Sequence, residues 1–213
     1  YWRDWSSDVC SSDLLGNPDT LFLDPSLNYD LVVNTTPAIR KNAIIIEKHT
    51  HNTIQVSAPQ GLLTLSSDKS IYAPNFTMEI SPKGETKTLL HQYYGQVNKF
   101  LVGKYDVEIF TIPRITQTVE INQSKTTTVS IAAPGELSYN FTKPLIAQLF
   151  MQDKQGFWSA IYTFSESSLS GKLLVQPGSY KLVYRIKEMK SSGYTNEKML
   201  NITSNKSTTI NIK

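Results

Sequence analysis

A tyrosine-led β pattern recurs along this chain and constrains its fold more than any other feature of the sequence. The pattern opens as YDLVV at Tyr29, YDVEI at Tyr105 and YKLVY at Tyr180. The tyrosines lie about 75 residues apart, and self-similarity at a fixed period indicates one structural unit repeated along the chain. The sequence therefore predicts tandem modules of a single kind.

A polar corner and a turn repeat together with the tyrosines. The corner reads HNTIQV from His51, TTTVSI from Thr126 and STTINI from Ser207, and the first two run into the turns APQG at Ala58 and APG at Ala133. Between these points, short runs rich in Val, Ile, Thr and Tyr are separated by turn residues about every 8 to 12 positions, which favours a sandwich or barrel over a βαβ chain. We predict an all-β fold of tandem small β-sandwich modules, each of about 75 residues.

The repeat divides the chain into four parts. Residues 1–14 lie outside the pattern, and residues 15–48 are interpreted as the truncated end of a preceding β-module. Residues 49–122 and 123–213 are predicted to be two β-sandwich modules.

The tyrosines of the two modules are expected to be structural. In QPGSY, which ends at Tyr180, the proline fixes φ and the glycine supplies a sharp corner. A tyrosine hydroxyl can bond the backbone around such a corner, as in the tyrosine corner of immunoglobulin-like domains. We predict that Tyr105 and Tyr180 are buried anchors rather than ligand contacts. We also expect the modules to superpose, with Tyr105 overlaying Tyr180 and Val129 overlaying Ile210 or Ile54.

Residues 1–14 require a separate explanation. From Asp4 to Leu14 the segment DWSSDVCSSDL resembles, residue for residue, the translation of a standard sequencing-library adapter, and segments of this kind are excluded from fold reasoning. The exclusion removes Cys10, the only cysteine, so we expect no thiol nucleophile, no Cys-ligated metal and no disulfide. We expect this segment, with Trp2 and Trp5, to fill neither module core.

The repeated motifs resemble those of two groups of proteins. LLVQPGSYKL, which contains Tyr180, resembles the L-x-x-P-G-x-Y-x-L motif of transthyretin-like and carboxypeptidase-regulatory-like β-sandwich modules, which also occur in tandem. The longer strings resemble the C-terminal β-rich region of von Willebrand factor type A domain proteins of the Bacteroidota. They are YDLVVNTTPAIRKNAIIIEKHTHNTIQVSAPQG, LVGKYDVEIFTIPR, VEINQSKTTTVSIAAPGEL and LLVQPGSYKLVYR. This second resemblance covers most of residues 21–213 and implies an extracytoplasmic location, at the cell surface or in the periplasm.

The metal-binding adhesion domain of that family precedes such modules and carries a D-x-S-x-S signature. The nearest match outside the adapter-like segment, Asp24-Pro25-Ser26-Leu27-Asn28, lacks the second serine. We therefore expect the adhesion domain to be missing from this chain, and none of its metal ligands is carried over.

Charge and hydropathy argue against two classes of partner. The chain has a formal net charge of +3, and its lysines are scattered, whereas nucleic-acid binding requires a basic stripe with stacking aromatic residues. No apolar run in the sequence approaches the roughly 18 residues of a membrane-spanning helix. We expect no nucleic-acid partner and no membrane span in this chain.

The histidines were considered as metal ligands. His49 and His51 would share one face of a strand and could flank a metal ion. The remaining histidine, His91, falls in another predicted strand, so no third ligand is evident. We expect exposed corner histidines and no metal site.

Catalysis by serine or by paired carboxylates is equally unsupported. No G-x-S-x-G elbow accompanies the serines. Glu79, Asp106 and Glu108 alternate with apolar residues, which indicates the polar face of a half-buried sheet rather than the carboxylate pair of a glycosidase. We predict no enzymatic activity, no catalytic or metal-binding residue, and no cofactor.

Aromatic residues offer a possible sugar-stacking platform. The candidates are Phe157, Trp158, Tyr162 and Phe164, with the pair Tyr93-Tyr94. Simple alternation places Trp158, Ala160, Tyr162 and Phe164 on one face of a strand, which is more typical of a core.

Two functions remain open. The favoured one is a non-catalytic extracytoplasmic structural or interaction module, the C-terminal part of a von Willebrand type A-like surface protein. The alternative is a carbohydrate-binding or accessory β-module of a secreted hydrolase. In either case the partner would be a protein or a glycan, which the sequence does not identify. We expect recognition at loops that differ between the modules, chiefly Ser81–Gly84 and Asp153–Gly156.

Overall fold

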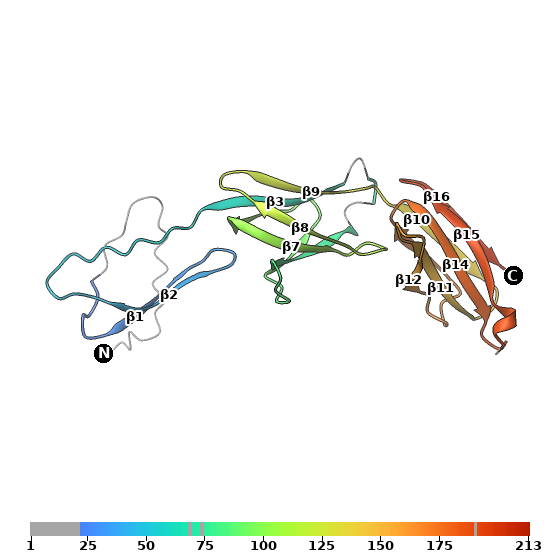
Figure 1. Ribbon diagram of the computed structural model, residues 1–213, viewed down its shortest axis with the longest axis horizontal. Coiled ribbons are helices and arrows are strands. Elements are labelled where there is room, and N and C mark those ends of the chain that lie inside the picture. The colour runs from blue at the N-terminus through green and yellow to red at the C-terminus, as the bar shows by residue number, and fades with distance from the viewer. Residues whose placement is uncertain (1–21, 68–69, 73–74, 190) are drawn as a thin grey trace, which may run out of the picture. The chain divides into compact units, whose positions relative to one another are not determined.

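The chain is built almost entirely of β-strands. The computed structural model describes residues 22–67, 70–72, 75–189 and 191–213, and Figure 1 shows their strands. No α-helix occurs among these residues, and η2 (Ser192–Tyr194) is a short 3₁₀ turn. The all-β prediction is therefore confirmed. The adapter-like segment, with Trp2 and Trp5, lies outside the described residues.

The strands belong to two compact units, one holding residues 22–33 and 38–56 and the other holding residues 34–37 and the described residues from 57 to 213. In chain order they are β1 (Asn28–Val33), β2 (Ile39–Ile45), β3 (Gln60–Ser67), β4 (Thr77–Pro82), β5 (Leu90–Tyr93), β6 (Val97–Leu101), β7 (Gly103–Ile109), β8 (Ile115–Ile121), β9 (Thr126–Ile131), β10 (Gly135–Phe141), β11 (Leu145–Gln152), β12 (Trp158–Thr163), β13 (Ser170–Val175), β14 (Gly178–Ile186), β15 (Asn196–Ile202) and β16 (Ser207–Ile212).

The first unit contains a single antiparallel pair, β1 with β2. The pairing shifts between Tyr29 and Leu31, where the Asp30 carboxylate accepts a 2.9 Å hydrogen bond from the Ala43 backbone N–H. The repeat of the corner HNTIQV predicts a strand at Thr53–Val56 as well, and this prediction is wrong, because residues 50–59 form no strand. Its counterparts in the other unit pair with a strand of their own sandwich, and residues 50–56 have no such partner among the described residues.

The second unit contains two sandwiches with the same order of strand pairing. In the first sandwich the sheets are β6-β3-β9 and β5-β4-β7-β8, and in the second they are β13-β10-β16 and β12-β11-β14-β15. In both, the last strand pairs in parallel with the first, β9 with β3 and β16 with β10, and the remaining pairs are antiparallel. Each sandwich encloses its own apolar core.

These parallel pairs correct the expected boundaries. β9 completes the first sandwich, because Val129 and Ile131 are buried in the same core as Leu63 and Leu65 of β3. The boundary that we placed between residues 122 and 123 therefore falls between β9 and β10. Likewise the first unit runs to Val56, past the expected end at residue 48.

Two glycines occupy the same position in the two sandwiches. A Cβ added to Gly61 would collide with the backbone oxygen of Asn122, and one added to Gly135 would lie 2.5 Å from that of Thr203. Each glycine thus lets the first strand of its sandwich pass close to the turn that precedes the last strand. Four residues after these glycines, Leu65 pairs with Val129 and Tyr139 pairs with Ile210. Val129 and Ile210 therefore occupy equivalent positions.

Tyr105 and Tyr180 also occupy equivalent positions. Tyr105 on β7 is 4% exposed and Tyr180 on β14 is 1% exposed. Their hydroxyls donate hydrogen bonds to the carbonyl oxygens of Leu101 (2.8 Å) and Gln176 (2.7 Å), four residues upstream in both cases. The prediction of two buried tyrosine anchors is confirmed.

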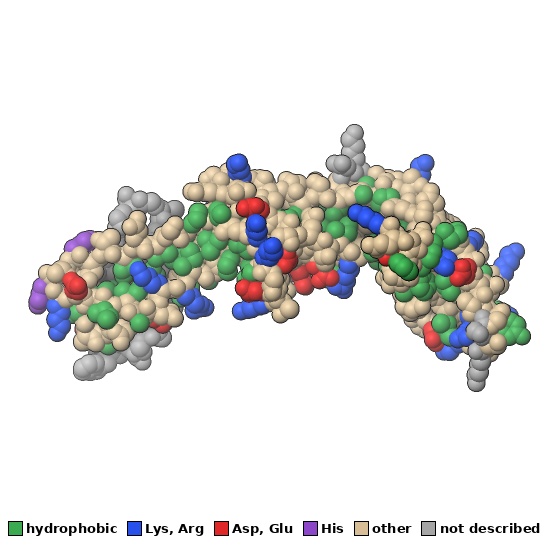
Figure 2. All heavy atoms as spheres, viewed as in Figure 1, with side chains coloured by type: hydrophobic (Ala, Val, Ile, Leu, Met, Phe, Trp, Pro, Cys, Tyr) green, Lys and Arg blue, Asp and Glu red, His purple; other side chains and the backbone are tan. Residues whose placement is uncertain are grey.

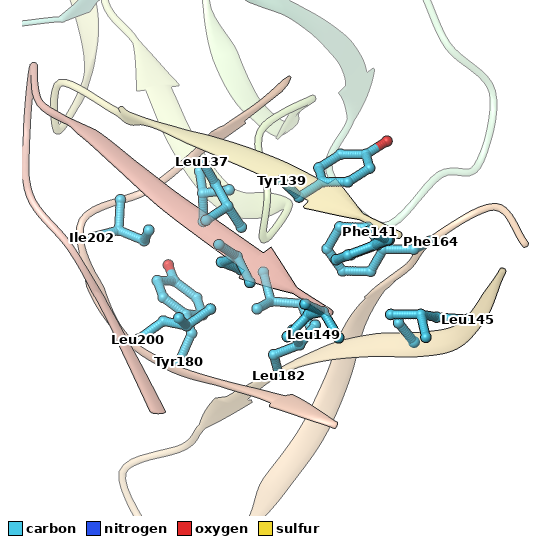
Figure 3. Close-up of a cluster of buried hydrophobic side chains, with 14 residues drawn as sticks. Leu137, Tyr139, Phe141, Leu145, Leu149, Phe164, Tyr180, Leu182, Leu200 and Ile202 are labelled. Atoms are coloured by element: carbon cyan, nitrogen blue, oxygen red, sulfur yellow. The ribbon is translucent and has the colours of Figure 1, made fainter. Parts of the chain in front are cut away.

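The core of the second sandwich gathers around Tyr180. Figure 3 shows its ring beside Leu200, the residue of β15 with which Tyr180 pairs. Burial raises the pKa of the Tyr180 hydroxyl to about 12 and raises the pKa of the Tyr105 hydroxyl in the same direction.

Candidate interaction surfaces

The outer faces of the two four-stranded sheets carry different side chains at equivalent positions. In the first sandwich Ser81, Asp106 and Thr118 pair across β4, β7 and β8. In the second sandwich the corresponding row across β11, β14 and β15 is Phe150, Lys181 and Met199. In both rows the residue of the middle strand, Asp106 or Lys181, directly follows the buried tyrosine of its sandwich. The framework is shared, and the exposed chemistry is not.

The outer face of the first sandwich is an acidic groove with a volume of about 340 Å³. Its lining residues are Glu79, Ser81, Glu85, Thr86, Thr88, Asp106, Val107, Glu108 and Thr116. Asp106 and Glu108 alternate with the buried Val107 and Ile109, as expected for a half-buried strand. Figure 2 shows Asp and Glu side chains over this sandwich, with Lys and Arg side chains beside them.

The carboxylates of this groove are held by local partners. Asp106 accepts hydrogen bonds from the Thr118 hydroxyl (2.6 Å) and the Gly84 backbone N–H (2.8 Å), and these bonds lower its pKa. Glu108 pairs with Arg114 at 2.8 Å. A general acid needs a raised carboxyl pKa, yet the pKa shifts resolved for described carboxyl groups, at Asp24, Asp106 and Glu136, are all downward. Asp106 is therefore held as a carboxylate and is not tuned to donate a proton.

The histidines do not converge on a metal site. His49 and His51 are exposed, and His49 adopts a left-handed conformation with φ of 59°. His91 lies on β5, with its Nδ1 3.7 Å from a Glu79 carboxylate oxygen and its ring stacked 6.0 Å from Phe110. Within the described ranges, no group of three or more His, Cys, Asp or Glu residues is arranged to hold a metal ion.

The aromatic group near β12 is divided between the two faces of the sheet. Leu149 of β11 pairs with Tyr162, but the next residue, Phe150, pairs with Ala160, so Ile161 is an extra residue on β12. Such a bulge reverses the alternation. The expectation that Trp158, Ala160, Tyr162 and Phe164 share one face is therefore wrong. Tyr162 and Phe164 pack in the core, and Trp158 lies on the outer face.

The resulting outer surface, which we call the Trp158 face, consists of Phe150, Trp158, Lys181 and Met199. The Lys181 ammonium lies 4.8 Å from the centre of the Trp158 ring and 3.2 Å from a Glu197 carboxylate oxygen. Met199 is 61% exposed, and Phe157, which precedes the face, is 72% exposed. Sequence reasoning missed this surface because one inserted residue, with no glycine to mark it, decides which way Trp158 points.

The loops expected to mediate recognition are both tight turns. In the first sandwich, Gly84 has φ of 77° and its N–H is bound by Asp106. In the second, the Asp153 carboxylate accepts hydrogen bonds from the backbone N–H groups of Gln155 (2.9 Å) and Phe157 (2.8 Å). The second turn thus holds exposed Phe157 beside the Trp158 face. In the part of the chain that the structure describes, no helix is long and apolar enough to cross a membrane.

The fold defines a β protein of sandwich domains without α-helices among its described residues. No protein-family model matches the chain, and no curated protein matches it in sequence. Among solved structures it resembles GBS52, the minor pilin of Streptococcus agalactiae, at 14% identity and a TM-score of 0.34, over 73% of this chain and 94% of the pilin. It also resembles a candidate adhesin from Bacteroides ovatus at 9% identity and a TM-score of 0.29, over 78% of this chain and 98% of that one.

A further resemblance is to the TIE protein of Bacillus anthracis, at 15% identity and a TM-score of 0.29 over 74% of this chain. The match covers 34% of that protein's chain, so this chain spans about a third of its length. At these identities the likenesses concern the β fold alone.

Proposed function

We propose that the chain is a non-catalytic structural and interaction module of an extracytoplasmic surface protein. One observation carries this proposal: the sandwiches share their framework but not their exposed chemistry. Gly61 and Gly135 lie at equivalent close approaches, whereas Asp106 stands where the second sandwich has Lys181. A fold that keeps its turns and core while its titratable groups change preserves a shape and not a reaction.

The Trp158 face is the proposed binding surface. Exposed apolar patches mark interaction sites more often than scattered apolar residues do, and aromatic residues and methionine are enriched in the buried centres of interfaces. Met199 and Trp158 lie on the outer side of a sheet, where Lys181 lies against the Trp158 ring and is ion-paired with Glu197. We favour a protein as the partner, because an apolar centre bordered by one ion pair, Lys181 with Glu197, suits a protein surface.

Binding of the purified chain to an array of extracellular matrix proteins tests this proposal. Met199→Asp places a charge in the centre of the face and should abolish saturable binding. Thr118→Asp, at the equivalent exposed position of the first sandwich, is the matched control and should leave binding unchanged. Binding that survives Met199→Asp, or an array without any saturable binding, would contradict the proposed surface.

A carbohydrate-binding or accessory module is the second candidate. The aromatic side chains of Trp158 and exposed Phe157 favour it, because their rings offer apolar area to a sugar. A glycan array distinguishes the two functions. Saturable glycan binding that is lost in Trp158→Ala, without binding to proteins, would favour the carbohydrate-binding module.

We further propose that the parent protein is similar to von Willebrand type A surface proteins of the Bacteroidota, and that Asp4 to Leu14 derives from a sequencing adapter. The motifs that support this are those around Tyr29, Tyr105 and Tyr180. The native gene upstream of the Leu15 codon provides the test. A D-x-S-x-S domain there would support the surface protein, and a hydrolase domain would support the accessory module.

A further inference from the structure

A backbone contact joins the two sandwiches, which belong to one compact unit. The carbonyl oxygen of Ile112, in the loop between β7 and β8, accepts a 2.7 Å hydrogen bond from the backbone N–H of Gln176. Gln176 is the residue whose carbonyl oxygen accepts the Tyr180 hydroxyl at 2.7 Å. Both backbone groups of Gln176 are thus engaged, one across the contact and one within the second sandwich.

The same arrangement occurs a second time within this unit. The carbonyl oxygen of Thr36 accepts a 2.8 Å hydrogen bond from the backbone N–H of Leu101. Leu101 in turn presents its own carbonyl oxygen to the Tyr105 hydroxyl at 2.8 Å. Leu101 and Gln176 differ in chemistry, and the arrangement uses only their backbone atoms.

The loops that provide the acceptors have the same internal bond. In each loop a threonine hydroxyl donates to the carbonyl oxygen of the proline two residues later, Thr35 to Pro37 and Thr111 to Pro113, both at 2.6 Å. The residue between threonine and proline points its carbonyl oxygen at the receiving N–H. Residues 187–195 of the second sandwich occupy the corresponding connection between β14 and β15 and contain no proline.

Side chains cross between the sandwiches at the same place. Ile112 belongs to the first sandwich by sequence but packs against the core of the second. Leu174 of β13 belongs to the second sandwich but packs against the core of the first, whereas its neighbour Leu173 packs against its own core. Each core is therefore completed by one residue of the other sandwich.

We propose that the Thr-x-Pro loop is a docking element for the tyrosine corner of the next β-module, and that it couples the stabilities of the two sandwiches. The partner that fits this loop is another module of the same chain. The N–H that donates to the loop belongs to the residue four positions before a buried tyrosine, and the carbonyl oxygen of that residue accepts the tyrosine hydroxyl. Opening of the contact removes an apolar side chain from each core and frees the N–H of Gln176. Unfolding of one sandwich therefore weakens the other.

Hydrogen exchange measured by mass spectrometry on the full chain tests this coupling, because amide exchange reports the opening of each region separately. Peptides covering β7 report the first sandwich, and peptides covering β14 report the second. Ile112→Ala should speed exchange in β14 by about tenfold, because the core of the second sandwich loses a partly buried aliphatic side chain. Ile115→Ala is the matched control, since Ile115 lies in the same sandwich and packs against its own core.

A second pair of variants, in the second sandwich, keeps the test valid if one variant fails to fold. Leu174→Ala should speed exchange in β7, whereas Leu173→Ala should speed exchange in β14 and leave β7 within about twofold of the parent. Coupling is supported if both crossing residues change the other sandwich. The proposal is overturned if Ile112→Ala changes only β7 and Leu174→Ala changes only β14.

Discussion

Removal of the Tyr180 hydroxyl should lower the stability of the second sandwich by a predictable amount. The hydroxyl is buried and donates a 2.7 Å hydrogen bond to the Gln176 carbonyl oxygen. Tyr180→Phe keeps the ring and removes this bond, and a buried polar group left without its partner costs about 1 to 3 kcal/mol. We expect a loss of about 1 to 2 kcal/mol, compared with about 3 to 5 kcal/mol when the whole ring is removed in Tyr180→Ala.

Thermal unfolding followed by Trp158 fluorescence measures this loss. Trp2→Phe and Trp5→Phe in the background leave Trp158 as the only tryptophan. For a domain of this size, 1 kcal/mol corresponds to roughly 4 to 8 °C in Tm, so Tyr180→Phe should lower the midpoint by about 5 to 15 °C. Tyr184→Phe is the control, because Tyr184 lies on the same strand and its hydroxyl has no hydrogen-bond partner among the described residues. Equal midpoints for the two variants would refute the role assigned to the Tyr180 hydroxyl.

The same tyrosine predicts a dependence on alkaline pH. Burial raises the Tyr180 pKa from 10.0 to about 12 in the folded state, so the folded chain holds this proton more tightly than the unfolded chain does. The stabilisation is present below pH 10 and is lost as the pH rises towards 12. The parent should therefore lose more stability than Tyr180→Phe across this window, and parallel losses would contradict the argument.

The remaining predictions concern the framework. In urea denaturation, Gly61→Ala and Gly135→Ala should each cost about 1 to 3 kcal/mol through overpacking, whereas Gly103→Ala, whose Cβ would meet only a side chain at 3.7 Å, should be nearly neutral. Gln176→Leu should raise the midpoint, because the Gln176 amide nitrogen is buried without a partner and its removal ends a desolvation cost of about 1 kcal/mol or more. Glu136→Gln should flatten the acid dependence of stability, because the Lys172 hydrogen bond lowers the Glu136 pKa, so that the parent's stabilisation is present above the unfolded pKa and lost as the pH falls.

Local motifs were enough to predict the two buried tyrosines, but they did not predict which strands pair over long distances in the sequence. Tyr105 and Tyr180 were recognisable because each follows a glycine-containing turn, which is a signal within a few residues. The place of β9 was not recognisable, because its partner is β3, and a parallel pairing between the ends of a sandwich leaves no mark in the residues between them. The division of the chain was therefore shifted by one strand.

The Trp158 face and the contact between the two sandwiches could not be predicted from the sequence, for related reasons. Trp158 faces outward because Ile161 is inserted into β12, and a bulge without glycine or proline looks like ordinary alternation. The hydrogen bonds from the Thr-x-Pro loops are made with the backbone N–H groups of Leu101 and Gln176, which share no side-chain chemistry. Backbone N–H and carbonyl groups are present in every residue, except that proline lacks the N–H. A comparison of the module sequences therefore cannot detect a contact that only these groups make.

Turnover by the purified chain tests the central claim, a scaffold without catalysis, most directly. The chain should be incubated with ester, peptide and glycoside substrates, alongside variants of the groove residue Glu79 and its neighbour His91. We predict no turnover above buffer, because the Thr118 hydroxyl and the Gly84 N–H hold Asp106 as a carboxylate and lower its pKa, and Glu108 is paired with Arg114. Turnover that disappears in Glu79→Gln or His91→Ala would contradict the account.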